Sequence, residues 1–272
     1  MRVCVTIPTL NSAKTLRSTL ESVREQTFKD VGITIVDSYS TDGTPEIARE
    51  FTDNVINYRG KVLGARMEGF KHDQGDYHLI LDSDQVLERT TLERCLQVSD
   101  RYDMLCLEER SLNPATWLER LYDADRTLLH KNMGSYIDSV TGVMCPRFYR
   151  SDILEKAFSN ILPECMPEIH AYEDAIIFYE AFKHSSRVGL VKGSIWHREP
   201  KYLSELWRKN YRYGKDVRQM HELNCYQELV GKKERFRKFD RDEPVLSLKA
   251  NLLLVLKGVP YKLGYTFGRK NG

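Results

Sequence analysis

The chain has 272 residues, of which 41% are hydrophobic and 29% are charged, and its formal net charge is only +2. This composition is ordinary for a soluble chain that can bury a sizeable core, as one large domain or two small ones. No apolar stretch approaches the ~20 residues of a membrane span. The chain starts with a strand-like VCVTI at 3–7 and lacks the basic start and apolar core of a secretory signal. We therefore expect a protein of the cytoplasmic side.

The cysteines are scattered and form no CxxC pair, so the sequence indicates neither a zinc site nor a redox motif. Free thiols in a reducing cytoplasm are the expectation. The six residues are Cys4, Cys95, Cys106, Cys145, Cys165 and Cys225.

Strand-like and helix-like patterns alternate along the first half of the chain. A first strand is predicted at 3–7, and Pro8 closes it. Ser12 is placed to cap a helix whose apolar residues recur on one face, and Thr44 is placed to cap a second helix through Phe51. The other elements expected here are strands at 33–37, 54–58 and 77–82 and a helix at 61–72.

Four β-α units in a row predict an α/β fold with a mostly parallel sheet that is flanked by helices. Ligands of such sheets bind at the carboxyl ends of the strands. Pro8, Asp37 and Asp82 all fall at such ends. We therefore expect the site along this edge of the sheet.

The second half is less regular. The charged stretch at 208–216 fits either a helix face or a loop that meets a diphosphate or a lipid. The charged run from Gly231 to Glu243 is the first plausible boundary, so we expect a main domain at 1–231 and a helical C-terminal appendage at 232–272. The elements predicted in this half are strands at 103–109 and 187–197, a strand or strand pair at 140–150, and helices at 117–129 and 174–182.

The stretch ILDSDQ at 80–85 is the most informative motif, because an apolar strand ends in two carboxylates, Asp82 and Asp84. Side chains two residues apart on an extended backbone point the same way. The pair could therefore share one divalent cation with the oxygens of a diphosphate. This arrangement is suited to a nucleotide-sugar enzyme.

Five motifs in order carry a resemblance to a known family: PTLN at 8–11, DSYSTDGT at 37–44, GARMEGF at 64–70, LDSD at 81–84 and YED at 172–174. Together they resemble the family 2 glycosyltransferases of the GT-A fold, over residues 1 to about 200. The resemblance implies a Rossmann-like GT-A sheet, a UDP- or GDP-sugar donor, Mn²⁺ or Mg²⁺, and inverting transfer. The nearest likeness is to prokaryotic enzymes that decorate glycans or lipid-linked acceptors.

The resemblance also implies roles around the donor nucleotide. Pro8 and Asn11 would lie in the loop over the base and ribose, and Asp37 would accept from a base N–H. Asp42 matches a second acid of this loop, and Arg66 would meet the phosphate or ribose. Ser38 stands where the family has glycine after the first Asp.

For the chemistry, the resemblance implies that Asp84 contacts the metal directly, with Asp82 nearer the ribose or a metal-bound water and Ser83 beside them. His197 matches a late metal-binding histidine. Asp174 would be the general base, because an acceptor hydroxyl must lose its proton as it attacks the anomeric carbon. A phosphate acceptor would need no base.

Three alternatives stay open at this point. A polyprenyl phosphate could be the acceptor in place of a hydroxyl. LDSDQV also fits the pattern of haloacid-dehalogenase phosphatases, in which Asp82 would be a nucleophile, although three β-α units precede it here. A nucleotide-sugar fold that serves only as a binding module is the third alternative.

The C-terminal segment is basic and apolar. Residues 232–272 contain eleven bases and four acids, a net charge of +7. Apolar residues mixed with lysines at 245–268 suit a segment on an anionic membrane surface, whereas a helix packed back on the enzyme or a dimer contact is the alternative. We expect no nucleic acid partner and a peripheral position at the inner face of the membrane.

Overall fold

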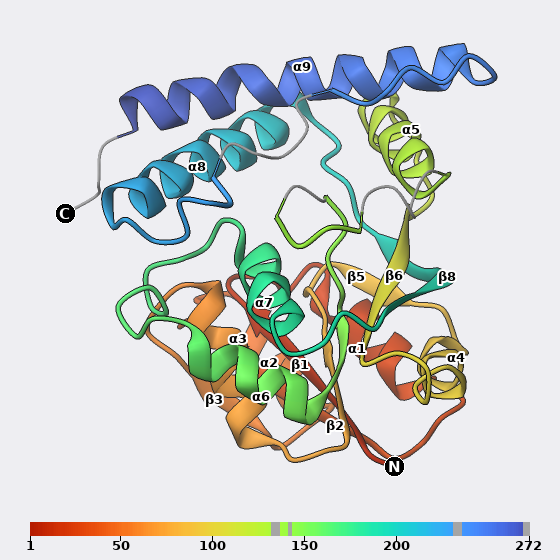
Figure 1. Ribbon diagram of the computed structural model, residues 1–272, viewed down its shortest axis with the longest axis vertical. Helices are drawn as coiled ribbons and strands as arrows, with labels where there is room; N and C mark the ends of the chain where they lie inside the picture. The colour runs from red at the N-terminus through yellow and green to blue at the C-terminus, as the bar shows by residue number, and fades with distance from the viewer. Residues whose placement is uncertain (132–136, 141–142, 231–235, 269–272) are drawn as a thin grey trace.

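The computed structural model describes residues 1–131, 137–140, 143–230 and 236–268. A twisted central sheet lies below a layer of helices, and further helices cover the two faces of the sheet (Figure 1). The amino terminus lies at the lower edge of the sheet, so the first strand runs upward toward the helical layer.

In the described part of the chain, the sheet has eight strands in the order β3-β2-β1-β4-β7-β6-β8-β5. Four strand pairs are parallel, and three, those of β7 with β4 and β6 and of β5 with β8, are antiparallel. The prediction of a mostly parallel sheet is confirmed. The strands are β1 (Val3–Thr9), β2 (Val31–Asp37), β3 (Val55–Asn57), β4 (Tyr77–Ile80), β5 (Gln85–Leu87), β6 (Met104–Ser111), β7 (Phe148–Arg150) and β8 (Val188–His197).

Most predicted helices are present. The charged stretch at 208–216 lies within α8, so it is a helix and not a loop. The sequence patterns did not predict α4 or α6. The helices of the described residues are α1 (Leu16–Arg24), α2 (Thr44–Arg49), α3 (Val62–His72), α4 (Thr91–Gln97), α5 (Trp117–Lys131), α6 (Ser151–Asn160), α7 (Glu173–Phe182), α8 (Leu203–Glu222) and α9 (Pro244–Phe267).

Local predictions failed at three places. α1 begins at Leu16, and the Ser12 hydroxyl lies 2.8 Å from the Ser83 hydroxyl instead of capping the helix. Thr44 lies inside α2, and its amide donates to Asp42. Of the strand expected at 140–150 only β7 forms, and residues 141–142 lie outside the described part of the chain.

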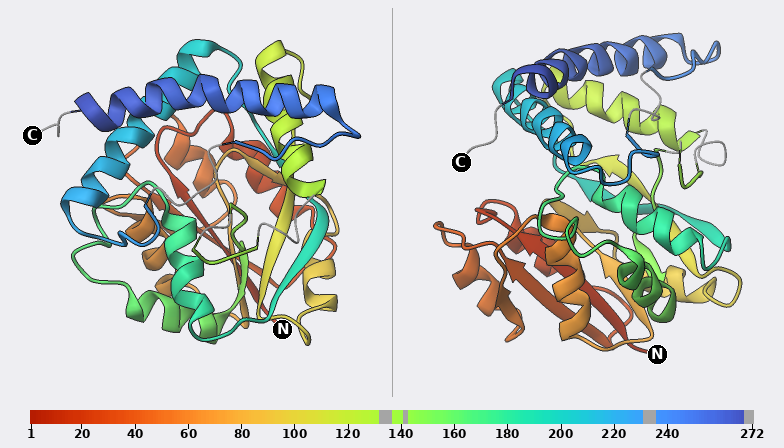
Figure 2. Two further views of the ribbon diagram at one scale, coloured as in Figure 1. Left: turned by 45° about the horizontal axis from the view of Figure 1, so that its top comes forward. Right: turned by 60° about the vertical axis from the view of Figure 1, so that its left-hand side comes forward.

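The two views of Figure 2 show helices on both faces of the sheet. An apolar core lies between the sheet and its helices on each face. On one face, Val5 and Ile7 of β1 pack with Leu16 and Leu20 of α1, as the apolar spacing predicted. On the other face a larger core gathers around α6 and α7. Because β1 and its neighbours are buried on both sides, their carboxyl ends are held rigidly at one edge.

A third layer consists of α5, α8 and α9, joined by a small core of Leu118, Leu206 and Leu253. α8 and α9 approach closely, since a Cβ at Gly264 would lie 2.0 Å from the Tyr211 carbonyl. The C-terminal segment is therefore helical, as predicted, and its inner side packs on the enzyme. The predicted boundary begins at 231–235, which lie outside the described residues.

Two of the cysteines are not free thiols. Cys165, before α7, and Cys225, after α8, are both buried and form a disulfide with 6.2 Å between their Cα atoms. The expectation of six free thiols is wrong for this pair, because residues 60 positions apart meet only in the folded chain.

None of the helices in the described ranges is long and apolar enough to cross a membrane.

Candidate functional site

The loops after β1 and β2 are tied together by Asp37. Its carboxylate accepts from the Thr9 hydroxyl at 2.8 Å, and from the amide and hydroxyl of Ser40 at 2.8 and 2.6 Å. Asp37 is 1% exposed, so in this arrangement it organises the loop, and its contact with a base stays a prediction. Pro8 lies within β1, opposite Val36 of β2 and one residue before the strand ends, and its position over the base and ribose stays a prediction.

Asn11 and Asp42 lie in the same pair of loops and are both exposed. Asn11 adopts a left-handed backbone with φ 51°, and its amide donates to the Ser40 hydroxyl at 2.8 Å. Asp42 accepts from the amides of Ala13 and Thr44, each at 3.1 Å, and the Thr44 hydroxyl lowers the pKa of its carboxyl. Both residues thus shape a polar rim where a nucleotide could lie.

Asp82 is held by two guanidinium groups. Arg66 Nη2 lies 2.7 Å from its Oδ1, and Arg147 Nη2 lies 3.2 Å from its Oδ2. Burial alone would raise the pKa of Asp82, but Arg147 and Arg66 outweigh it and hold the pKa well below its usual range. A carboxylate with both oxygens on arginines has little capacity left for a cation. Ser83, next along the chain, faces the Ser12 hydroxyl.

Asp84 points to a histidine instead. Its Oδ1 lies 3.6 Å from His197 Nε2, at the carboxyl end of β8, and β5 and β8 pair in the register that brings them together. Among the described residues no other charged group pairs with the Asp84 carboxylate. His197 Nδ1 lies 3.6 Å from Glu199 Oε2, a carboxylate that can orient the ring.

Ion pairs between alternating charges run from Asp82 to Glu199, and the His197 ring lies between Glu199 and Asp84. Arg147 Nε lies 2.7 Å from Glu109 Oε1, and Arg126 contacts both Glu109 and Glu199. Burial would raise the pKa of Glu109, but Arg147 and Arg126 lower it to about 2. The successive contacts of this network join Asp82, Arg147, Glu109, Arg126, Glu199, His197 and Asp84, in that order.

The YED motif brings two more carboxylates to the same place. Arg66 Nη2 lies 3.3 Å from Glu173 Oε1 and 3.3 Å from Asp174 Oδ1, and Arg147 Nη2 lies 3.6 Å from Asp174 Oδ2. Tyr172, just before α7, has φ 64°, a left-handed turn that starts the helix beside the arginines. Burial, then the Asp174 carboxylate, raises the pKa of Glu173 to about 7 against the pull of Arg66.

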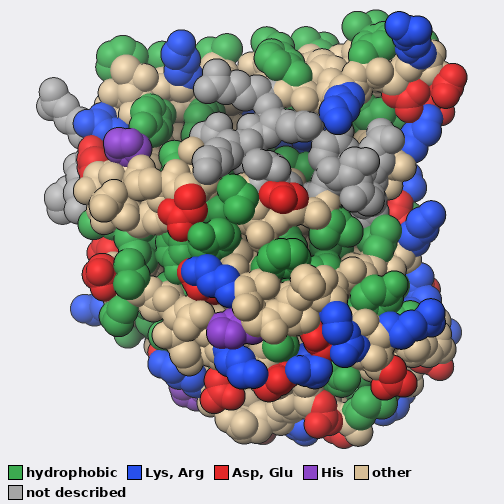
Figure 3. Space-filling model, in the orientation of Figure 1, with side chains coloured by type: hydrophobic (Ala, Val, Ile, Leu, Met, Phe, Trp, Pro, Cys, Tyr) green, Lys and Arg blue, Asp and Glu red, His purple; other side chains and the backbone are tan. Residues whose placement is uncertain are grey.

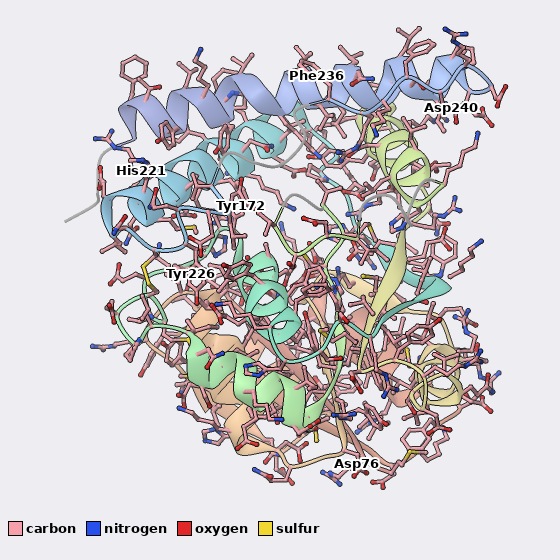
Figure 4. All side chains as sticks on the ribbon, viewed as in Figure 1. Asp76, Tyr172, His221, Tyr226, Phe236 and Asp240 are labelled. Carbon is pink, nitrogen blue, oxygen red and sulfur yellow. A yellow bond between two sulfur atoms is a disulfide. The ribbon has the colours of Figure 1, made fainter. Side chains whose placement is uncertain are left out.

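A cavity of about 190 Å³ opens beside these carboxylates. In Figure 4, Tyr172 lies between α7 and α8. Its amide donates to the Tyr213 hydroxyl of α8 at 3.3 Å, and the helical layer thereby closes one side of the cavity. The polar and charged lining residues are Glu109, Arg126, His130, Arg147, Tyr172, Glu173, Asp174 and Tyr213.

The site has a surplus of negative charge. Three guanidinium groups, at Arg66, Arg126 and Arg147, face six carboxylates, an excess of three negative charges when all are ionised. The carboxylates are Asp82, Asp84, Glu109, Glu173, Asp174 and Glu199. Within the described ranges no three or more His, Cys, Asp or Glu residues gather as a metal site. Asp84 and His197 would therefore need ligands from a substrate to complete one.

The family model described as "Glycosyl transferase family 2" matches residues 4–158, more than half of the chain. The chain belongs to this glycosyltransferase family. The resemblance of the five motifs is thereby confirmed, and the haloacid-dehalogenase alternative is excluded.

Relatives and solved structures extend the likeness beyond the matched segment. The cholesterol galactosyltransferase of Borreliella burgdorferi is 25% identical over 218 residues, covering 70% of this chain and 58% of that protein. The poly(ribitol-phosphate) beta-N-acetylglucosaminyltransferase TarS of Staphylococcus aureus is 24% identical, covering 76% of this chain and 38% of that one. The chain thus spans about half the length of these relatives or less.

A solved structure of the mannosyltransferase PcManGT from Pyrobaculum calidifontis, in complex with GDP-Man and Mn²⁺, has a TM-score of 0.57. It is 18% identical and covers 98% of this chain and 76% of that one. At this identity the likeness shows the fold, and it confirms the predicted GT-A architecture of this family 2 glycosyltransferase.

Four residues of the site escaped the sequence reasoning: Glu109, Arg126, Arg147 and Glu199. One signal was available, because Glu199 follows His197 by two residues. The other three come from β6, α5 and the segment before β7, and no local pattern relates these segments.

Proposed function

We propose that this family 2 glycosyltransferase moves a sugar, with inversion, from a UDP- or GDP-sugar to a hydroxyl of a glycan or lipid-linked acceptor. The observation that carries the proposal is the Asp84–His197 pair, 3.6 Å apart, at the edge where the loops of β1 and β2 converge with LDSD. Solved structures of similar fold are complexes of TarS with UDP-GlcNAc and of PcManGT with GDP-Man and Mn²⁺, which supports a nucleotide-sugar donor.

The residues at this edge fit a divalent cation. The Asp84 carboxylate and His197 Nε2 supply one oxygen and one nitrogen donor, and Glu199 faces the far nitrogen of the ring. The negative surplus of the site favours a cation there. When bound, Mn²⁺ or Mg²⁺ would neutralise charge on the leaving diphosphate. Asp82, already held by two arginines, would act on the nucleotide side and leave direct metal contact to Asp84.

Asp174 is the proposed general base for the acceptor hydroxyl. Arg66 and Arg147, at 3.3 and 3.6 Å, fix the orientation of its carboxylate at the wall of the cavity. Glu173, the neighbouring carboxylate on Arg66, has a pKa of about 7, close to the pH at which a general base is most effective. Because a phosphate acceptor needs no base, this acidic pair favours a hydroxyl over a polyprenyl phosphate.

The direct test is a screen of UDP- and GDP-sugars for metal-dependent cleavage of the donor, with the released nucleotide measured. We expect turnover with at least one donor in Mn²⁺ or Mg²⁺ and none in EDTA. Asp84→Asn should abolish it, whereas Asp53→Asn, an exposed carboxylate in a loop before β3, should not. Full turnover in EDTA, or equal loss in both variants, would refute the proposal.

A further inference from the structure

The outer side of α9 carries an apolar stripe. Val245, Leu248, Leu252, Val255 and Val259 follow one another every three or four residues and are each at least 49% exposed. Residues three or four apart lie on the same side of a helix. Hydrophobic side chains interleaved with Lys and Arg lie along the upper edge of Figure 3, where α9 runs. The helix is thus apolar on its outer side as well as on its packed side.

Exposed aromatic residues also lie on α5 and α8, the two helices that pack against α9, and on the segment before α9. Trp117 at the start of α5 and Trp207 in the first turns of α8 are 55% and 46% exposed. Each is the direct neighbour of a residue in the small core that holds the middle of α9, Leu118 and Leu206 respectively. Figure 4 places Phe236 beside the middle of α9, and it is 59% exposed. We call the exposed residues of 117–123, 201–212 and 236–267 the C-terminal face.

The C-terminal face is strongly basic. Nine of its exposed residues are Lys or Arg, and only Asp242 and Glu243 are exposed acids. The other four acids of these segments are not exposed: Asp123 is half-buried, Asp240 pairs with Lys131, and Glu119 and Glu205 cap helices. Glu119 accepts from the Thr116 amide at 2.7 Å, and Glu205 accepts from the Lys201 amide at 2.8 Å. The face therefore combines apolar side chains with positive charge.

We propose that the C-terminal face docks on an anionic lipid surface, with α9 lying in the plane of the headgroups. Apolar side chains, tryptophans and bases on one surface are what such docking uses, since each contributes at a different depth of the interface. A second copy of the chain is a less favourable binding partner for this face, because a two-fold contact would place the same basic patch against itself.

Docking on this face has a consequence for the proposed function. The carboxyl ends of β1, β2 and β4 point toward the helical layer (Figure 1), and Tyr213 of α8 closes one side of the catalytic cavity. A docked layer would hold the cavity close to the lipid plane and favour a lipid-linked acceptor. This consequence rests on the proposed function, whereas docking itself does not.

The test is flotation of the full chain with neutral and with anionic phospholipid vesicles. We expect binding to the anionic vesicles only, and release as salt shortens the Debye length from ~30 Å to ~3 Å. Leu252→Glu and Val255→Glu should each lower the bound fraction by about tenfold or more. The matched control is Leu162→Glu, because Leu162 is 50% exposed in the loop after α6 and lies outside the face. Circular dichroism confirms that each variant is folded.

Four results would overturn the inference: no flotation with either vesicle at low salt, equal binding to neutral vesicles, full binding by the Leu252 and Val255 variants, or equal loss in the Leu162→Glu control. A mass in light scattering that doubles with concentration and is halved by Leu252→Glu would assign the face to a second copy instead. If the wild-type chain cleaves a donor but does not bind the vesicles, only this inference is refuted. If it binds the vesicles but cleaves no donor, only the proposed function is refuted.

Discussion

Arg66 tests the electrostatics of the site most sharply, because its guanidinium is fully buried and lies within 3.3 Å of three carboxylates. Replacing it by methionine keeps most of the volume and removes the charge. Arg147 remains on Asp82 and Asp174, so Glu173 loses the most. Removing one partner of a buried ion pair costs about 3–5 kcal/mol of unfolding free energy, and we expect Arg66→Met to fall in this range.

The loss should depend on pH in a defined direction. The pKa of Glu173 in the folded state, about 7, already lies above its ordinary value of 4.5, and without Arg66 it rises further. A raised folded-state pKa contributes stability at low pH that is lost as pH rises through it. The loss of unfolding free energy caused by Arg66→Met should therefore be smaller at about pH 5.5 than at about pH 8.

The assay is urea unfolding of wild type and variant by circular dichroism across this range of pH. Adding Glu173→Gln to Arg66→Met removes the uncompensated carboxylate and should recover about 1–2 kcal/mol at the higher pH. Arg66→Lys, which keeps the charge, should cost less than Arg66→Met. A cost below about 1 kcal/mol, or one that neither pH nor the second substitution changes, would refute this account of the cluster.

Three further outcomes are expected. Asp84→Ala should lose metal-dependent binding of the donor in a titration while its melting temperature stays near wild type; unchanged binding would remove Asp84 from the metal site. Asp174→Asn should bind donor normally and lower the chemical rate by ~10²-fold or more in single-turnover kinetics, and normal turnover would leave the base unassigned. Burial lowers the pKa of both His78 and His130 to about 4. Because a histidine with a lowered folded-state pKa takes up its proton more readily when unfolded, the stability of the protein should fall as pH drops from about 6.5 toward 4. Acid unfolding that is the same in wild type, His78→Phe and His130→Gln would contradict this expectation.

The sequence predicted the first half of the fold well, because β1 to β4 are formed by apolar runs with clear helices between them. It missed β5, which has three residues, and it did not separate the three-residue β7 from its surroundings. Strands this short pair through long-range contacts and carry little periodicity. The Cys165–Cys225 disulfide was missed for a similar reason, since its residues are 60 positions apart and meet only in the larger core of the folded chain.

The site was predicted in part. The LDSD and YED motifs and His197 stand at strand and helix ends, and the fold brings them to one edge, as the order of motifs indicated. The sequence did not show that Asp82 would be neutralised by Arg66 and Arg147, because a guanidinium partner 65 residues away leaves no local pattern. Asp82 and Asp84 look equivalent in the motif, but Asp82 is paired with two arginines and Asp84 only with His197 among the described charged groups.

Calorimetric titration of the chain with UDP- and GDP-sugars, in Mn²⁺ and in EDTA, measures whether the Asp84–His197 edge binds a nucleotide sugar with a metal ion. We expect saturable binding of at least one donor in Mn²⁺ and little or none in EDTA. The metal-dependent part of the binding should be lost in Asp84→Asn and His197→Gln but not in Asp53→Asn. Two results would contradict a nucleotide-sugar site at the Asp84–His197 edge. One is that every donor binds as strongly in EDTA as in Mn²⁺, and the other is that both site variants bind the donor as well as wild type.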